Sequence, residues 1–250
     1  YYGDKVISLD DIFIAGMHNV ENCMAAISIV KEFGVSNEVI VDVISNFRGV
    51  EHRLEYVDTI DGRRFYNDTE ATNIKCTQIA LSSFDKPIIV ILGGLERGQD
   101  FNELSPFMKN VKSIIGIGQC RERVLDFGKS LDIPTYIYEH LVDGFDKCFE
   151  VSDSGDIILL SPASASWDQY KECEVRGSEF KELVKAYNRY SKWSHVWTDI
   201  DRQVDKGYQS VKSGYYTSSQ QSAVCVEYFD KCPQKTSSSY DNYYWSDEVN

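Results

Sequence analysis

The chain has 250 residues, 42% of them hydrophobic, and a formal net charge of −13. So acidic a protein lacks the basic face that sequence-independent binding to nucleic acid or to an anionic membrane requires, which excludes both partners. No apolar run reaches the ~18 residues of a membrane-spanning helix. The start has no basic segment followed by an apolar stretch, so no signal peptide is predicted. We expect a cytoplasmic protein.

The first residue and the cysteines lead to two further expectations. The chain begins with Tyr1 and not with Met, which indicates that it starts within a longer protein. Its seven cysteines are scattered, without a Cys-x-x-Cys pair or a nearby His. This pattern is typical of reduced thiols and predicts no metal site.

Two helices are predicted near the start. Apolar residues recur at helical spacing over His18–Phe33, and Gly34 stands just past the end, where helices commonly stop. Asn37–Asn46 is the second candidate.

The middle of the chain alternates buried strands with amphipathic helices. Continuous apolar runs predict three neighbouring parallel strands, Pro87–Leu92, Ser113–Ile117 and Asp156–Leu160. Arg64–Tyr66 is a fourth strand candidate. Helical patterns cover Asn73–Leu81, capped by Thr72 or Asn73, and Glu122–Leu131. The predicted fold is α/β: a Rossmann-like, doubly wound and mostly parallel sheet.

Ligands of such sheets bind at the carboxyl ends of the strands. Those ends are residues 67–73, 93–98, 116–119 and 161–167. In the loop after Leu92, Arg97 can hold a carboxylate with its forked guanidinium. Gly116-Ile117-Gly118 is only a tight turn, because Arg121 stands where a dinucleotide site needs its third glycine.

Residues 185–250 differ from the rest of the chain. They contain no Leu, a single Ile, nine Tyr and eleven Ser. So few branched aliphatic side chains cannot build an ordinary core. We expect an irregular Tyr/Ser-rich tail, either an appendage or foreign sequence.

Five motifs in order resemble the Mur ligases, which are ATP-dependent amide ligases of peptidoglycan synthesis. Gly16–Asn22 resembles the G-x-H-N-x-x-N that closes their central domain, and Phe47–Glu55 the F-x-G-x-x-H-R-x-E hinge that follows. Asn67–Asn73 is similar to N-D-S-K-A-T-N, Gly93–Phe101 to the glycine loop of Gram-positive members, and Ser161–Phe180 to S-P-A-C-A-S-x-D…F-x-x-R-G-x-x-F. The resemblance is strongest to members that add D-glutamate to UDP-N-acetylmuramoyl-L-alanine.

The resemblance implies a domain organisation. Residues 1–51 would be the end of the central ATPase domain, 52–184 the C-terminal amino-acid-binding domain, and 185–250 a tail outside the family. It implies D-glutamate and UDP-N-acetylmuramoyl-L-alanine as partners, with ATP and Mg²⁺ as cofactors of the complete enzyme.

The resemblance also assigns residues to ligands. Asn22, Arg53 and Asp68 would face the adenine nucleotide, with Asp68 bordering the ribose. The residues that would hold D-glutamate are Thr72, Arg97, Ser166 and Trp167. No catalytic residue and no metal ligand is assigned.

Three positions depart from the family motifs. Glu70 stands where the family has Lys, Ser164 where it has Cys, and Cys173 where an aromatic residue walls the D-glutamate pocket. Like charges ~4–6 Å apart repel by about 3–4 kcal/mol at an effective dielectric of ~20. Glu70 must therefore point away, pair with Arg97 or another cation, or be protonated. We expect weak D-glutamate binding and a gain on Glu70→Lys.

The 250 residues contain no Gly-x-x-x-x-Gly-Lys-Ser/Thr phosphate loop. The chain by itself is therefore not expected to cleave ATP. Three interpretations remain open: a part of a D-glutamate-adding ligase, a non-catalytic degenerate homologue that binds a ligand or partner, and a folded domain without activity.

Overall fold

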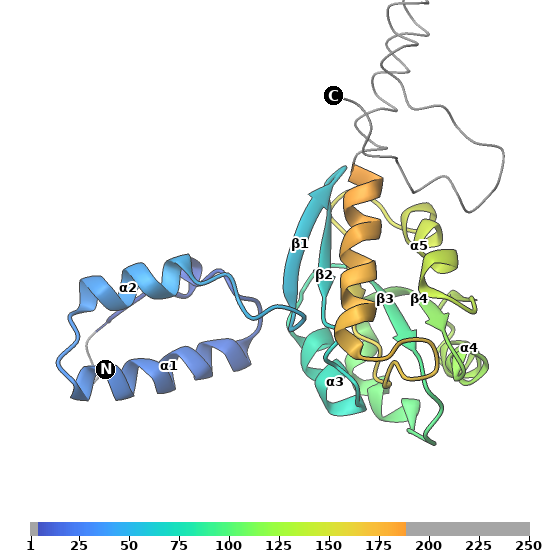
Figure 1. Ribbon diagram of the computed structural model, residues 1–250, viewed down its shortest axis with the longest axis horizontal. Coiled ribbons are helices and arrows are strands. Elements are labelled where there is room, and N and C mark those ends of the chain that lie inside the picture. The colour runs from blue at the N-terminus through green and yellow to red at the C-terminus, as the bar shows by residue number, and fades with distance from the viewer. Residues whose placement is uncertain (1–4, 189–250) are drawn as a thin grey trace, which may run out of the picture. The chain divides into compact units, whose positions relative to one another are not determined.

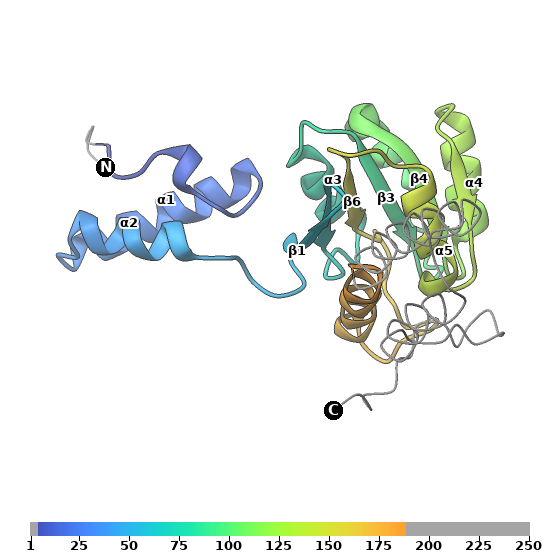
Figure 2. The same cartoon turned by 90° about the horizontal axis from the view of Figure 1, so that it is seen from above.

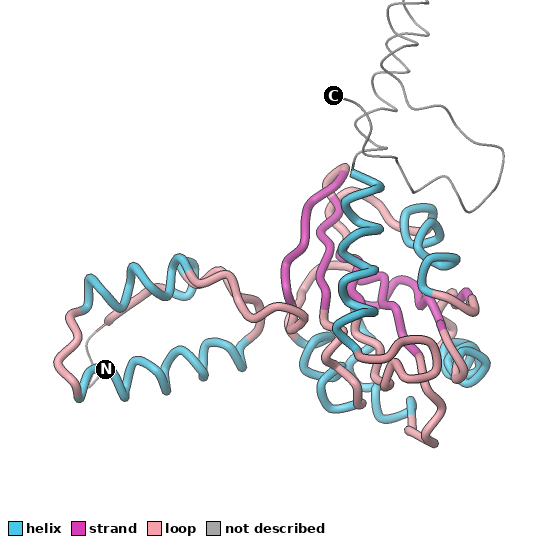
Figure 3. Tube along the Cα trace, viewed as in Figure 1, coloured by secondary structure: helices cyan, strands magenta, loops and turns pink. Residues whose placement is uncertain are grey.

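A computed structural model of the chain describes residues 5–188, in which a helical N-terminal stretch is followed by a region of strands and helices (Figures 1 and 3). The helices are η1 (Leu9–Asp11), α1 (Met17–Glu32), α2 (Asn37–Asn46), α3 (Ile74–Ser82), η2 (Phe101–Asn110), α4 (Arg121–Ser130) and α5 (Leu141–Glu150). The strands are β1 (Glu55–Ile60), β2 (Arg63–Asn67), β3 (Ile88–Gly93), β4 (Val111–Ile117), β5 (Thr135–Ile137) and β6 (Ile157–Leu160). A last helix begins at residue 173 and continues to residue 188.

The six strands form one sheet in the order β1-β2-β6-β3-β4-β5. Only the hairpin of β1 and β2 is antiparallel. β3 lies between β6 and β4 and pairs with both in parallel, with Ile91 opposite Leu160 on one side and Ile115 on the other. The predicted trio of neighbouring parallel strands is confirmed, and so is the mostly parallel α/β sheet.

Helices cover both faces of this sheet (Figure 2). Because side chains alternate along a strand, Ile88, Val90 and Leu92 pack into one core with α3, η2 and α4. On the other face Phe65 contacts Phe149 of α5 and Phe180 of the last helix, with ring centroids 5.3 and 6.4 Å apart. Burial on both faces explains why the central strands are continuously apolar.

Helix boundaries agree with the sequence signals. α2 spans the predicted residues, and its cap Ser36 accepts a hydrogen bond from the Val39 N–H. Gly34 follows α1 with a φ of +75°, a conformation that favours glycine. The cap of α3 is Asn73, whose side chain accepts from the Cys76 N–H at 3.1 Å. The alternative cap, Thr72, is wrong.

Several elements were not predicted. They are η1, β1, β5, η2, α5 and the helix from residue 173. Beyond residue 188, the expectation for the Tyr/Ser-rich tail lies outside the described residues. Among residues 5–188, no helix combines the length and the apolar character needed to cross a membrane.

Candidate functional site

The loops after β3 and β6 meet at the carboxyl edge of the sheet. The Gly93 N–H donates to the Pro162 carbonyl at 2.8 Å, and the Leu95 N–H donates to the Ala165 carbonyl at 2.8 Å. These bonds fix the glycine loop against residues 162–165. The arrangement is the one expected for a ligand site of a doubly wound sheet.

A cavity of about 500 Å³ opens between these loops and the start of α3. Its lining residues are Thr72, Asn73, Ile74, Lys75, Leu95, Arg97, Gln99, Asp100, Glu103, Ala163, Ser164 and Ala165. The volume lies within the usual range for small-molecule sites. The cavity brings together Thr72 and Arg97, two of the four residues assigned to the amino acid.

Arg97 and Trp167 lie against one another. The guanidinium carbon of Arg97 is 4.6 Å from the centroid of the Trp167 ring, a cation–π contact. Trp167 is 63% exposed. Among the described residues no carboxylate forms an ion pair with Arg97. Its charge is therefore available to an anionic ligand in the cavity.

Ser166, the fourth assigned residue, is not among the residues that line the cavity, although its neighbour Ala165 is. Its side chain is 1% exposed, and its Oγ has no hydrogen-bond partner. Nearly all buried hydroxyls are paired, so an unpaired one beside a cavity calls for an explanation.

Glu70 does not pair with Arg97. Its Oε2 accepts a hydrogen bond from Arg53 Nη2 at 3.4 Å, and its Oε1 lies 3.6 Å from the Cys173 sulfur. Of the three outcomes expected for Glu70, the structure has pairing with another cation. That cation is the one the resemblance assigned to the nucleotide.

Cys173 is not among the residues that line the cavity. Its carbonyl oxygen accepts from Thr69 Oγ1 at 2.8 Å. Burial, followed by the nearby carboxylates of Glu174 and Glu70, raises the pKa of its thiol to about 11. The thiol is therefore neutral near pH 7.

The three residues assigned to the nucleotide do not form a nucleotide site by themselves. Arg53 is engaged by Glu70. Asp68 is 7% exposed, and its two oxygens accept from the Leu54 N–H at 3.1 Å and the Ser161 hydroxyl at 2.8 Å. Asn22 is on the surface of α1, where its amide donates to Asn19 at 3.4 Å. No reaction step through ATP or Mg²⁺ follows from these residues.

Two groups of side chains among the described residues have the types that bind metal ions. They are Glu51 with His52 and Glu55, and Glu70 with Cys173 and Glu174. In both groups a basic side chain already holds carboxylates: Lys181 bonds Glu51 and Glu55, and Arg53 bonds Glu70.

The buried Asp68 carboxyl should make the stability of the chain depend on pH. Burial raises its pKa from 3.8 to about 6, so the folded chain favours the protonated form. Below pH 3.8 the carboxyl is protonated in both states and does not affect the free energy of unfolding. As the pH rises from 3.8 to about 6, the free energy of unfolding falls by up to ~3 kcal/mol, because the unfolded chain loses this proton first. Between about pH 5 and 8, the free energy of unfolding should fall by ~1–2 kcal/mol more in the native chain than in Asp68→Asn.

Urea unfolding monitored by circular dichroism measures both curves. The Asn variant keeps an acceptor for the Leu54 N–H, so any difference in slope reports the carboxyl alone. Parallel curves would contradict the prediction.

Three residues that the structure connects to the site were assigned no role from the sequence. Gln99 and Lys75 line the cavity, and Gln99 Nε2 donates to Ser164 Oγ at 2.6 Å. Arg176 is completely buried behind the wall. A signal for Arg176 was present, because Phe180 lies four positions on and shares its face of the helix.

Proteins of known function resemble this chain across the stretch that carries the five motifs. The UDP-N-acetylmuramoylalanine–D-glutamate ligase of Bacillus subtilis (strain 168) is 45% identical over 185 residues, which cover 74% of this chain and 41% of the relative. The ligase of the same name from Lacticaseibacillus casei (strain BL23) is 44% identical over 188 residues, or 75% of this chain and 40% of the relative. The chain is homologous to the Mur ligases.

A solved Mur ligase has the same fold. The UDP-N-acetylmuramate–alanine ligase MurC of Thermotoga maritima superposes with a TM-score of 0.53 at 17% identity, covering 72% of this chain and 40% of that one. No family model matches the chain. The chain spans about two fifths of the length of the curated Mur ligases it matches. Their whole activity therefore involves regions with no counterpart in these 250 residues.

Proposed function

We propose that residues 52–184 bind D-glutamate as the amino-acid-binding domain of a cytoplasmic ligase that extends UDP-N-acetylmuramoyl-L-alanine. Residues 1–51 contribute the end of the central domain in this proposal. The remaining parts of the enzyme hold ATP and Mg²⁺. The observation that carries the proposal is the cavity at the sheet edge, where residues from three separate motifs converge.

The cavity suits an amino acid with two carboxylates. Arg97 offers a forked cation, and Thr72 offers a hydroxyl from the start of α3. The unpaired hydroxyl of Ser166 offers a further donor. Fixed donors of this kind orient the amino group of the ligand, and orientation is a large part of catalysis in ligases of two substrates. ATP supplies the phosphoryl group that activates the carboxylate of the acceptor.

A two-piece enzyme tests the proposal. The purified chain is mixed with the part of the Bacillus subtilis ligase that precedes its matched residues, together with UDP-N-acetylmuramoyl-L-alanine, ATP and Mg²⁺. We expect phosphate release that depends on D-glutamate. The chain alone should give none, because it has no phosphate loop.

The same N-terminal piece, supplied with the relative's own C-terminal part, is the control for complementation. Arg97→Met in the chain should abolish the phosphate release that D-glutamate induces. If the control pair is active while the pair with this chain is not, the proposal fails.

Ser166→Ala should separate stability from binding. Removing a buried hydroxyl that has no partner should raise the free energy of unfolding by ~1 kcal/mol. The same change should weaken D-glutamate binding roughly tenfold, because a hydrogen bond to a carboxylate is lost. Thermal melts and NMR titration measure the two effects.

Ser161 is the matched control for Ser166. It is also fully buried, but its hydroxyl donates to Asp68 and lies 3.1 Å from Thr77 Oγ1. Ser161→Ala should therefore destabilise the chain. Two alanine variants that both destabilise it would show that the Ser166 hydroxyl is paired in solution.

One observation favours a second candidate function, a ligand-binding homologue without catalysis. Glu70 is an anion at the position where the family motif has a lysine, and it forms an ion pair with Arg53. A chain of this kind would still bind D-glutamate in the cavity but would not complement the N-terminal piece. The two-piece assay and a D-glutamate titration together distinguish the two functions.

A further inference from the structure

Arg176 is the largest side chain that the described part of the fold buries completely. Its exposure is 0%, and it lies in the first turn of the helix that begins at residue 173. A buried charge is normally paired with an opposite charge, because desolvation costs several kcal/mol. Among the described residues, no carboxylate forms an ion pair with Arg176.

The guanidinium instead holds neutral acceptors from two loops of the candidate site. Nε donates to Thr69 Oγ1 at 3.0 Å, and Nη2 donates to the carbonyls of Thr69 at 3.0 Å and Ser164 at 3.2 Å. Ser164 lines the cavity, so the cation lies directly behind its wall. Thr69 precedes the turn that leads to Thr72 at the cavity's other side.

One nitrogen of the group remains without a partner. Nη1 of Arg176 is buried and donates to no acceptor, and within residues 5–188 the other buried side-chain polar atom without a partner is Ser166 Oγ. Both belong to the segment around residues 164–176. A Cβ placed on Gly94 would lie 3.1 Å from Nη1 and 2.4 Å from the Ala165 carbonyl, so the glycine loop passes directly over this nitrogen.

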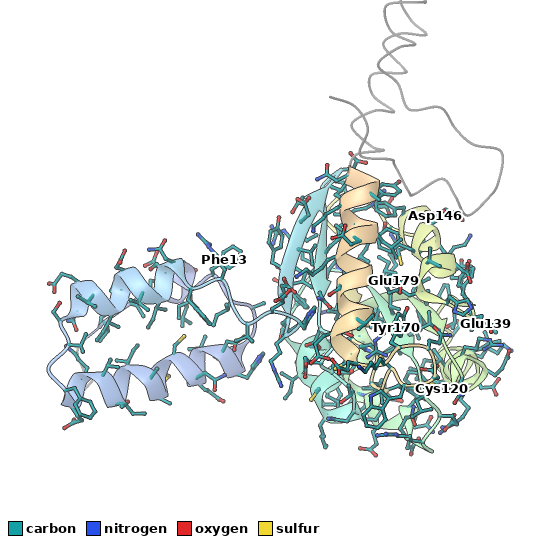
Figure 4. All side chains as sticks on the ribbon, in the orientation of Figure 1. Phe13, Cys120, Glu139, Asp146, Tyr170 and Glu179 are labelled. Carbon is teal, nitrogen blue, oxygen red and sulfur yellow. The ribbon has the colours of Figure 1, made fainter. Side chains whose placement is uncertain are left out.

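The charge of Arg176 persists at neutral pH. Burial lowers its pKa to about 10, and the nearby Tyr170, Cys173 and Asp168 act in the opposite direction. Tyr170, which precedes the last helix, is hydrogen-bonded to Glu179 of that helix; both residues are labelled in Figure 4. The group therefore carries a full positive charge.

The lining of the cavity carries no net charge of its own. Lys75 and Arg97 are balanced by Asp100 and Glu103. A ligand with two negative charges therefore gains little net attraction from the lining. Arg176 lies behind the wall and forms no ion pair with a described carboxylate, although the charge of Asp168 acts on it from a longer distance. Its cation supplies the missing positive charge.

We propose that Arg176 is the specificity-determining and positioning residue that makes this cavity prefer an amino acid with two carboxylates over one with a single carboxylate. The inference rests on the proposed function and names what sets its substrate class. Arg176 positions the Thr69 turn and the Ser164 loop. Its positive charge, which lies behind the cavity wall, attracts the second carboxylate of the bound amino acid.

The experiment compares D-glutamate with D-glutamine, which match in size and differ by one carboxylate. Affinities are measured by NMR titration of the full chain, which detects millimolar binding. The wild-type chain should prefer D-glutamate by at least about tenfold. Arg176→Gln keeps an amide donor but removes the charge, and it should reduce the preference to about threefold or less.

The control is Arg63→Gln. Arg63 also holds a hydroxyl and a carbonyl, both of Ser152, at 2.8 Å, but it lies at the start of β2, the opposite end from the cavity. This variant should keep the full preference. A purely structural role for Arg176 would weaken both ligands equally and leave their ratio unchanged, which would overturn the inference.

Arg176→Lys is the second variant, in case the glutamine variant does not fold. It should retain the preference, and a folded lysine variant without it would overturn the inference. A wild-type chain that does not prefer D-glutamate overturns it without any variant. If the ratio is unchanged while the two-piece enzyme is active, only this inference fails; if D-glutamate does not bind and the enzyme is inactive, the proposed function fails as well.

Discussion

Replacing Gly93 with alanine is expected to remove a large share of the chain's free energy of unfolding. The residue ends β3 with a φ of +115°, and an added Cβ would lie 2.1 Å from the backbone oxygen of Ile117. That oxygen belongs to the neighbouring strand β4, so it cannot move aside without breaking the β3–β4 ladder. The expected loss is at least ~4 kcal/mol, a large share of the ~5–15 kcal/mol that stabilises an ordinary domain.

Gly98 in the same loop provides the control. Its φ of +73° is also in the left-handed region, but an added Cβ would meet nothing within 4 Å. Gly98→Ala should therefore cost only the ~1–2 kcal/mol of the backbone conformation. Urea unfolding of both variants separates conformational strain from close packing. Equal losses in the two variants would contradict the argument.

The glycines at the end of β3 also shape the candidate site. Gly93 and Gly94 let β4 and the loop of residues 162–165 approach the end of β3, and this approach forms one wall of the cavity. A folded Gly93→Ala chain would therefore also lose D-glutamate binding.

Glu70→Lys is expected to give the largest gain in ligand affinity. The Glu70 carboxylate is 3.4 Å from Arg53, so the substitution frees Arg53 and adds a second cation beside it. The change should favour a phosphate group at Arg53 by ~2–3 kcal/mol, or roughly 30- to 150-fold in affinity. NMR titration with ADP measures this gain.

The sequence alone assigned the gain to D-glutamate, because Glu70 was expected beside the amino acid. Since Glu70 pairs with Arg53 and not with Arg97, we now expect D-glutamate affinity to rise by less than about tenfold. A larger gain for D-glutamate than for ADP would return Glu70 to the amino-acid site. Unchanged affinities for both ligands would leave the charge argument without support.

Asp126→Lys is the matched control for this variant. It changes the net charge by the same amount, on the exposed face of α4. Exposed charges more than about 10 Å from a ligand are largely screened at moderate salt. The control should therefore bind ADP no better than the native chain.

The sequence by itself determined the sheet and the family. Runs such as Ile88–Leu92 and Ile157–Leu160 are apolar at every position, because helices cover both faces of the central strands. Short apolar runs that alternate with helical patterns leave few topologies, and a parallel doubly wound sheet is one of them. The ordered motifs led to the same homology that the 44–45% identities show.

Elements with weaker patterns could not be predicted from the sequence. β1 is half-buried and reads EYVDTI, and its place beside β2 depends on pairing across a tight hairpin. β5 has only three residues and is added to the edge of a sheet that already exists. Their stability comes from neighbours that are distant in the chain or from a turn, not from a local periodicity.

The charges at the site were decided only by the tertiary structure. The sequence identified Glu70 and Arg97 but could not determine which cation Glu70 meets, because Arg53 and Arg97 are 17 and 27 positions away in opposite directions. Arg176 lies within the motif Ser161–Phe180, but the sequence predicted no role for it. Whether a buried arginine has an anionic partner depends on every element packed around it. Local patterns determine which segments are buried, whereas ion pairs and unpaired polar atoms depend on distances of a few ångströms between segments that only folding brings together.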